Sequence, residues 1–228
     1  MTAPEGPGGA PHHPAATTTI DPLGKGTTLN TLSAPRILHE TSSGITATTI
    51  YDEMLARREL AVVGDIEQGM AFSLCQHIRR LEAENPAAPI AVFVSSPGGS
   101  VGAGLAVYDL LRSVSCPVRT VCTESAASMG SVIFMAGERR EMYPHAELMV
   151  HDPLIPRGAG GSALSVQETS RRLMSTRRTL NTILAERSGL TLKRVQQLTG
   201  KESYLSAERA VELGFATGII GSAKEKEN

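Results

Sequence analysis

The 228-residue chain has no excess of charge of either sign. Its 22 Lys and Arg residues nearly balance 23 Asp and Glu residues, which gives a net charge of −1 with neutral histidines. Nucleic acids and anionic membrane surfaces attract strongly basic patches, so we expect neither as a partner. The sequence also lacks an apolar run long enough to span a bilayer, and its N-terminus lacks the apolar segment of a signal peptide. We therefore expect a cytoplasmic protein.

Cysteine is scarce, and a nucleotide-binding signature is missing. Cys75, Cys116 and Cys122 are an odd number of thiols without the spacing of a metal site, which fits a reducing compartment. No G-x-x-x-x-G-K string followed by Ser or Thr occurs in a structured part of the chain, so we expect no ATP hydrolysis by this chain. We expect no cofactor and no metal, since the adjacent His12 and His13 lie in a segment expected to be disordered, where two histidines rarely form a metal site.

The first 30 residues differ in composition from the rest. Residues 1–22 are rich in Pro, Gly, Ala, Thr and His and contain almost no large apolar side chain. Such a segment cannot bury enough surface to offset the entropy of ordering it. We expect a disordered tail or a pro-segment over residues 1–30 and one folded domain over residues 31–228.

Strand-like and helix-like patterns alternate after residue 48. We expect strands at residues 59–63, 90–94, 118–121 and 147–151, and helices at 67–84, 101–111, 128–135, 162–187, near 191 and at 206–213. This alternation predicts an α/β fold with a mainly parallel sheet flanked by helices. Functional groups in such sheets gather at the carboxyl ends of strands, where Gly98, Gly99, Ser128 and His151 fall.

Ser128 is the candidate nucleophile. It lies in the string Glu124-Ser-Ala-Ala-Ser-Met-Gly130, where small neighbours and a strand-to-helix bend would leave its hydroxyl exposed. The upstream turn Ser96-Pro-Gly-Gly99 can aim backbone N–H groups at an oxyanion. The alternative is that Ser128 is a small residue required for helix packing.

His151 is the candidate base, and it is found by elimination. It alone among six histidines ends an apolar strand. The others lie in the tail, before the regular core, on a helix surface or in a turn: His12, His13, His39, His77 and His145. The alternative is a structural histidine bonded to the backbone.

Five strings together resemble the proteolytic subunit of the Clp protease family (ClpP), in the order of that family and over residues 37–220. They are Leu81-Glu-Ala-Glu-Asn-Pro86, Ser96-Pro-Gly-Gly99, Ala126-Ala-Ser-Met-Gly130, Met149-Val-His151 followed by Pro153, and Tyr204-Leu-Ser-Ala207. The resemblance implies a ClpP/crotonase-like fold with a protruding handle helix within about residues 154–190. It implies a serine endopeptidase enclosed in two stacked seven-membered rings, built from this chain or from this chain and a second ClpP-type chain. An AAA+ Clp ATPase would use the ATP and deliver unfolded polypeptide.

The resemblance also implies residue roles. Ser128, His151 and Glu202 would form the catalytic triad, the backbone N–H groups of Gly99 and Met129 the oxyanion hole, and Gly98 and Ser100 the edge that binds the substrate strand. The family usually has an aspartate where this chain has Glu202. Asp152 is the second candidate for orienting His151, although neighbouring residues on a strand point to opposite faces. A Ser–His dyad, or a triad ordered only by assembly, stays open.

The sequence departs from the family where the ATPase docks. Ala91 and Ser113 replace two aromatic residues of the family's docking cleft, while Phe93 and Met142 remain apolar. This weakens the expectation that the usual Clp ATPase binds. A catalytically specialised or regulatory ring subunit is therefore an alternative. A crotonase-type acyl-CoA enzyme is another, but it needs no serine nucleophile, so Ser128 and His151 argue against it.

Overall fold

The computed structural model describes residues 36–41, 44–155 and 160–221, so the expected tail at 1–30 lies outside the described residues. The chain divides into two units, Met1–Ile50 and Tyr51–Asn228. In the first unit, β1 (Arg36–Thr41) and β2 (Gly44–Thr49) form an antiparallel hairpin. The sequence analysis did not predict this hairpin. Helix α1 (Ile50–Ala56) begins at the boundary between the units.

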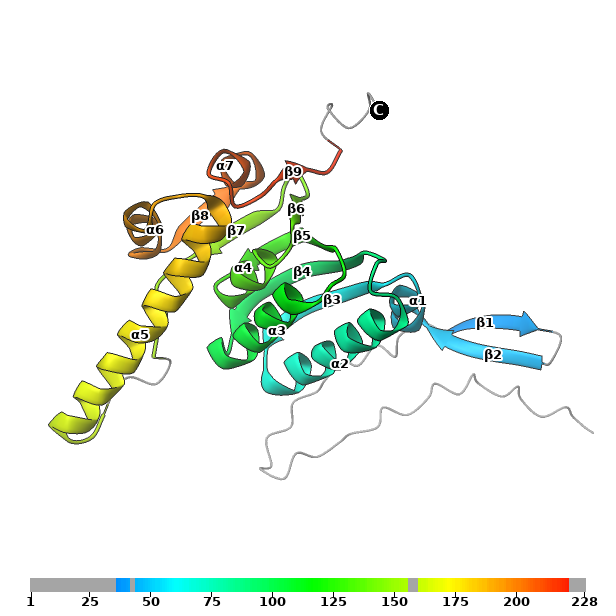
Figure 1. The fold of residues 1–228 in the computed structure, drawn as a ribbon, viewed down its shortest axis with the longest axis horizontal. Helices are drawn as coiled ribbons and strands as arrows, with labels where there is room; N and C mark the ends of the chain where they lie inside the picture. The colour runs from blue at the N-terminus through cyan, green and yellow to red at the C-terminus, as the bar shows by residue number, and fades with distance from the viewer. Residues whose placement is uncertain (1–35, 42–43, 156–159, 222–228) are drawn as a thin grey trace, which may run out of the picture. The chain divides into compact units, whose positions relative to one another are not determined.

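A seven-stranded sheet forms the centre of the second unit (Figure 1). Its order is β3-β4-β5-β6-β9, with β7 beside β5 and β8 beside β7. Every pair is parallel except β7 with β8, which confirms the expected mainly parallel α/β fold. The strands are β3 (Glu59–Ile66), β4 (Ile90–Gly99), β5 (Val118–Ala127), β6 (Arg139–Met142), β7 (Glu147–Val150), β8 (Ser203–Ser206) and β9 (Gly218–Ile219).

The helices fall close to their predicted ranges. They are α2 (Gln68–Glu84), α3 (Val101–Ser113), α4 (Met129–Phe134), α5 (Ala163–Ser188), α6 (Leu192–Thr199) and α7 (Ala207–Glu212). Figure 1 shows α2 and α3 side by side across one face of the sheet. All six residues of α4 are buried, so packing fixes the position of its N-terminus. Among the helices of the described ranges, none is long and apolar enough to cross a bilayer.

Strand β5 divides its pairing between two neighbours. Its first part, Arg119–Cys122, pairs with β6, and its last residues, Ser125–Ala127, pair with β7. Because β5 and β7 are parallel, the residues that follow them emerge at the same edge of the sheet. This fork brings together Ser128 and His151, which are 23 residues apart in the sequence.

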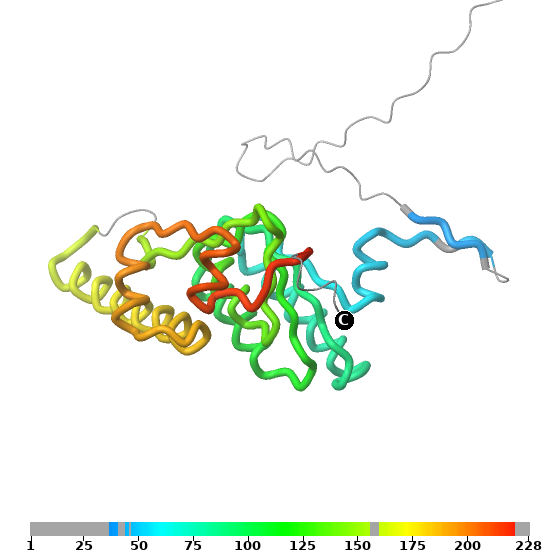
Figure 2. The backbone as a smooth tube through the Cα atoms, turned by 90° about the horizontal axis from the view of Figure 1, so that it is seen from above, coloured from blue at the N-terminus to red at the C-terminus, as the bar shows by residue number. Residues whose placement is uncertain are grey.

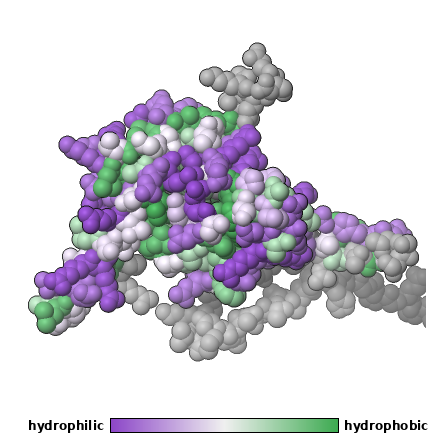
Figure 3. All heavy atoms as spheres, in the orientation of Figure 1, coloured by the Kyte–Doolittle hydropathy of each residue, from purple (hydrophilic) through white to green (hydrophobic). Residues whose placement is uncertain are grey.

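The long helix α5 is largely exposed. Its buried residues are Leu180, Asn181 and Leu184, all in its second half. Figure 2 shows α5, in yellow, extending away from the sheet, with α6 beside its base. Apolar side chains are visible near its free end in Figure 3, and Leu164 and Met174 are 77% and 56% exposed. The predicted long helix is thus present, and half of it has no core to pack against in one chain.

Candidate active site

Ser128 occupies a strained bend between β5 and α4. Its φ and ψ of 54° and −120° lie in a region that residues other than glycine rarely adopt, at a cost of about 1–3 kcal/mol. Hydrogen bonds hold the bend: the Ser128 N–H donates to Met149 O at 2.9 Å, and the Ser131 hydroxyl donates to Ser128 O at 2.6 Å. The strand-to-helix bend expected from the sequence is therefore present, and it leaves the hydroxyl partly exposed.

His151 follows β7 directly and faces this hydroxyl. Its Nε2 lies 2.8 Å from Ser128 Oγ. This is the distance at which an imidazole can accept the proton of an attacking serine. Both residues are partly buried. The structure thus brings together the two side chains that the sequence analysis singled out.

The glycine turn at the end of β4 packs directly on Ser128. Gly98 has φ +105°, and a Cβ on it would lie 2.6 Å from Ser128 Cβ and 3.0 Å from the Met129 amide nitrogen. Gly99 has φ +147°, and a Cβ there would collide with the backbone of Ile66. Met129 is the first residue of α4, so its N–H is one of the first-turn groups that no carbonyl of the same helix accepts. The predicted oxyanion donors therefore lie on two segments that meet at the serine.

Replacing Gly98 with alanine is expected to lower peptidase activity strongly, because the added methyl group would displace Ser128 or the Met129 amide. Gly102→Ala is the matched control, since a Cβ at Gly102, within α3, meets nothing within 4 Å. Thermal unfolding and peptide hydrolysis measured on both variants check this. Equal activity in the two variants would contradict the close packing of turn and serine.

The strand register places Glu202 across from His151. In the antiparallel pair of β7 and β8, Val150 faces Ser203 and Met149 faces Tyr204. Continuing this register by one residue sets Glu202 opposite His151, and opposed residues on neighbouring strands share a face of the sheet. The Glu202 carboxylate is hydrogen-bonded to Tyr204, whose hydroxyl donates to Oε2 at 3.3 Å.

Asp152 pairs with the long helix α5. Its Oδ2 accepts a hydrogen bond from Arg177 Nε of α5 at 2.6 Å. Within the described parts of the chain, the ring of His151 is hydrogen-bonded to Ser128 alone, so neither acid occupies its second nitrogen. Which acid orients His151 stays a prediction. Neither Tyr204 nor Arg177 was predicted as a partner of the two acids. Arg177 meets Asp152 only through a tertiary contact with α5, whereas Tyr204 lies two residues from Glu202, a spacing that places both side chains on one face of a strand.

A cavity of about 260 Å³ opens beside the Ser–His pair. Apolar side chains form most of its wall: Val101, Met129, Val132, Val150, Leu154, Leu180 and Leu184. Ser128 and His151 lie at the same cavity. The arrangement can hold one apolar side chain of a peptide while its carbonyl carbon faces the serine.

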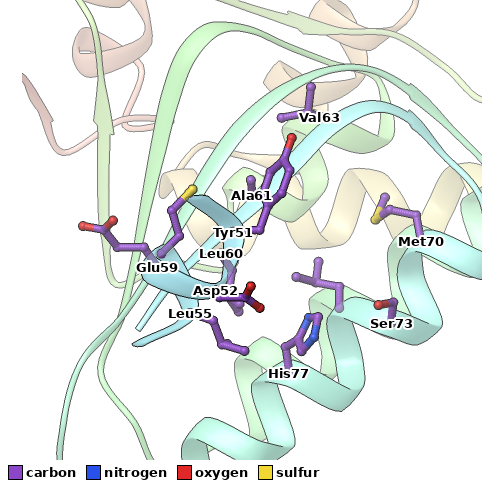
Figure 4. A pocket seen from close by; sticks show the side chains of 12 residues that line it. Tyr51, Asp52, Leu55, Glu59, Leu60, Ala61, Val63, Met70, Ser73 and His77 are labelled. Atoms are coloured by element: carbon purple, nitrogen blue, oxygen red, sulfur yellow. The ribbon is translucent and has the colours of Figure 1, made fainter. Parts of the chain in front are cut away.

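A second, larger cavity of about 360 Å³ lies away from this pair, between α1, β3 and α2. Figure 4 shows Tyr51 and Asp52 from α1 around it, with Ser73 and His77 from α2. His77, expected at the surface, is half-buried there. No Ser–His hydrogen bond is found among the described residues of its wall, so the candidate active site is the smaller cavity beside Ser128.

Burial raises the pKa of Cys122, in β5, to about 12, so its thiol stays protonated at neutral pH. In the described ranges, no group of three or more His, Cys, Asp or Glu side chains could hold a metal ion.

A known protein family matches the sequence that carries this arrangement. The model of the Clp protease family matches residues 42–223, well over half of the 228-residue chain. The matched range contains the serine bend, the strand-end histidine, the glycine turn and the long helix α5. The chain belongs to the Clp protease family.

Proposed function

We propose that this chain is a serine endopeptidase subunit in which Ser128 is the nucleophile and His151 the general base. The observation that carries the proposal is the 2.8 Å contact between Ser128 Oγ and His151 Nε2 at a strained strand-to-helix bend. The crotonase-type alternative would give this pair no role, and family membership supports a peptidase.

The reaction would proceed in two acyl-transfer steps. His151 takes the proton of Ser128 as Oγ attacks a peptide carbonyl, and the backbone N–H groups of Gly99 and Met129 stabilise the oxyanion. His151 then protonates the leaving amine, and the peptide bond breaks. Water, deprotonated by the same histidine, attacks the acyl-enzyme and restores Ser128. No step requires a cofactor or metal from this chain.

An extended substrate would bind along the turn that ends β4. Ser100 already uses its N–H for Ile66 O at 2.8 Å and its carbonyl for the Gly104 N–H at 2.9 Å. The Gly98 N–H also donates within the chain, to Ser96 Oγ at 3.1 Å, so a substrate strand that pairs at either residue would have to replace an internal hydrogen bond. Backbone pairing of this kind would make cleavage weakly selective for sequence, and the apolar cavity beside Ser128 would favour an apolar side chain before the cleaved bond.

The position of Glu202 favours an active site that is completed by a local rearrangement. Rotation of its side chain away from the Tyr204 hydroxyl, without movement of β8, would bring the carboxylate toward His151. That hydrogen bond is exposed, so it opposes the rotation only weakly. A regulatory ring subunit with a permanently incomplete triad is the alternative that this observation supports.

We further propose that the chain works inside a closed assembly in the cytoplasm, two stacked rings of seven subunits, either alone or with a second ClpP-type chain. The exposed first half of α5, with Leu164 and Met174 at its surface, supports a role in joining subunits. An AAA+ ATPase would supply unfolded chains. Docking of this ATPase has less support than the ring assembly. Of the two apolar residues at the expected docking cleft, Phe93 is half-buried and Met142 is fully buried, so Met142 cannot contact a docked partner.

The assembly is expected to have fourteen subunits and to cleave short peptides without ATP, while folded proteins are spared because they cannot enter the chamber. Native mass spectrometry combined with a fluorogenic peptide assay checks both points. Replacing Leu164 and Met174 with glutamate should dissociate the rings. A fully active monomer or dimer would contradict the enclosed chamber.

A further inference from the structure

We propose that the ion pair between Asp152 and Arg177 is a positioning element that holds His151 and Glu202 at their working separation. This inference rests on the proposed peptidase function. Neither residue touches the Ser128 hydroxyl, so each would act through the backbone beside it and not on substrate.

The first support is the side-chain contact between the strand end and the long helix. Arg177 Nε donates to Asp152 Oδ2 at 2.6 Å, and the two side chains are 26% and 31% exposed. Asp152 is bonded directly to His151 in the chain. The pair therefore attaches the segment that carries the base to α5, at the part of the helix just before its buried residues Leu180 and Asn181.

The second support is a backbone contact from the same residue. The Asp152 N–H donates to Thr199 O, the last residue of α6, at 2.7 Å. Glu202 follows Thr199 by three residues, immediately before β8. Asp152 is thus held by α5 through its side chain and by the α6–β8 connection through its backbone. One residue links the segment of the base to the segment of the candidate acid.

The third support is the polar, buried character of this junction. Asp152 Oδ1 and Thr199 Oγ1 are both buried and accept or donate no hydrogen bond within the described residues. A carboxylate with one oxygen unpaired is held in place mainly by its other contact, here Arg177. Losing the guanidinium would leave the whole carboxylate unpaired, so the strand end would move to solvate it. A displacement of about 1 Å at a catalytic group can cost roughly 100-fold in rate.

The test uses Arg177→Met and Asp152→Asn in the full chain, assayed at saturating and at limiting concentrations of a fluorogenic peptide. Both are expected to lower kcat by about 10- to 100-fold. KM should change much less than kcat, because the substrate edge at Gly98 lies on β4, away from the substituted side chains, although Pro153 and Leu154 beside the strand end line the apolar cavity. The double variant should be no worse than either single one, since both remove the same contact. Arg177→Lys, which keeps the charge, should recover most of kcat.

Arg172→Met is the matched control. Arg172 lies on the same helix and forms an ion pair of 2.9 Å with Glu168, but its partner is on α5 itself and both side chains are exposed. Thermal unfolding and native mass spectrometry on each variant separate a catalytic effect from loss of fold or of assembly. A partly exposed ion pair contributes little to stability, so folded, assembled variants are expected.

The positioning role would be overturned if the Arg177 and Asp152 variants had the same kcat as the Arg172→Met control, or if they changed KM alone. Either result would leave the proposed peptidase function standing. A parent chain without Ser128-dependent hydrolysis would instead overturn the proposed function. The two failures are therefore distinct.

Discussion

Replacing Ser128 with alanine is expected to lower kcat for a short peptide by on the order of 10⁶-fold, as removal of a serine nucleophile does in other serine peptidases. The hydroxyl is the only group lost, and the alanine would keep the same strained backbone at φ 54°. Fold and assembly should therefore stay unchanged, which thermal unfolding can verify. Hydrolysis of a fluorogenic peptide gives the rate.

Ser125→Ala serves as the matched control for this variant. Ser125 lies in the same strand, three residues before the bend, where β5 pairs with Glu147 of β7. It should retain parental activity. Parental activity in Ser128→Ala would show that another residue carries the chemistry.

Replacing Glu202 with glutamine is expected to lower kcat by about 10⁴-fold, because an amide cannot stabilise the imidazolium and can select the wrong tautomer of His151. The register of β7 with β8 supports this assignment, since it sets Glu202 opposite His151 while Asp152 faces Arg177. Asp152→Asn should lower kcat less, by about 10- to 100-fold, because it would displace His151 but would not remove the acid that hydrogen-bonds to it.

Tyr204→Phe separates the role of the carboxylate from that of its neighbour. It removes the hydroxyl that donates to Glu202 at 3.3 Å and leaves the acid in place, so activity should be kept or raised. A larger loss for Asp152→Asn than for Glu202→Gln would identify Asp152 as the orienting acid. No loss for either would indicate a Ser–His dyad.

The fold followed from the sequence wherever apolar periodicity was strong. The spacing of apolar residues alone indicated the buried faces of α2 and α3 and the apolar runs of β4 and β5. Strands β6, β8 and β9 were missed because they are short and have no apolar run, whereas the equally short β7 contains Leu148, Met149 and Val150 in succession. The β1–β2 hairpin was missed because neither strand has a long apolar run: β1 has only Ile37 and Leu38 in succession, and half of β2 is threonine.

The active site was predictable to the extent that it lies at element ends. Ser128 and His151 each follow a strand, and parallel pairing of β5 with β7 is enough to bring them together. The partner of Glu202 is local, but the partner of Asp152 was not predictable, because it depends on a tertiary contact. Arg177 meets Asp152 only through the packing of α5 beside the strand end, and the direction of the Glu202 side chain depends on a hydroxyl two residues away.

The most direct test of Ser128 as the nucleophile is to identify the residue that reacts with a serine-directed fluorophosphonate. The reagent is added to the parent chain, to Ser128→Ala and to His151→Ala, and the modified residue is mapped by peptide mass spectrometry. Because His151 Nε2 lies 2.8 Å from Ser128 Oγ, the account predicts one adduct per parent chain, on Ser128, with almost none in either variant. An adduct on another serine, or equal labelling of the parent and Ser128→Ala, would contradict it.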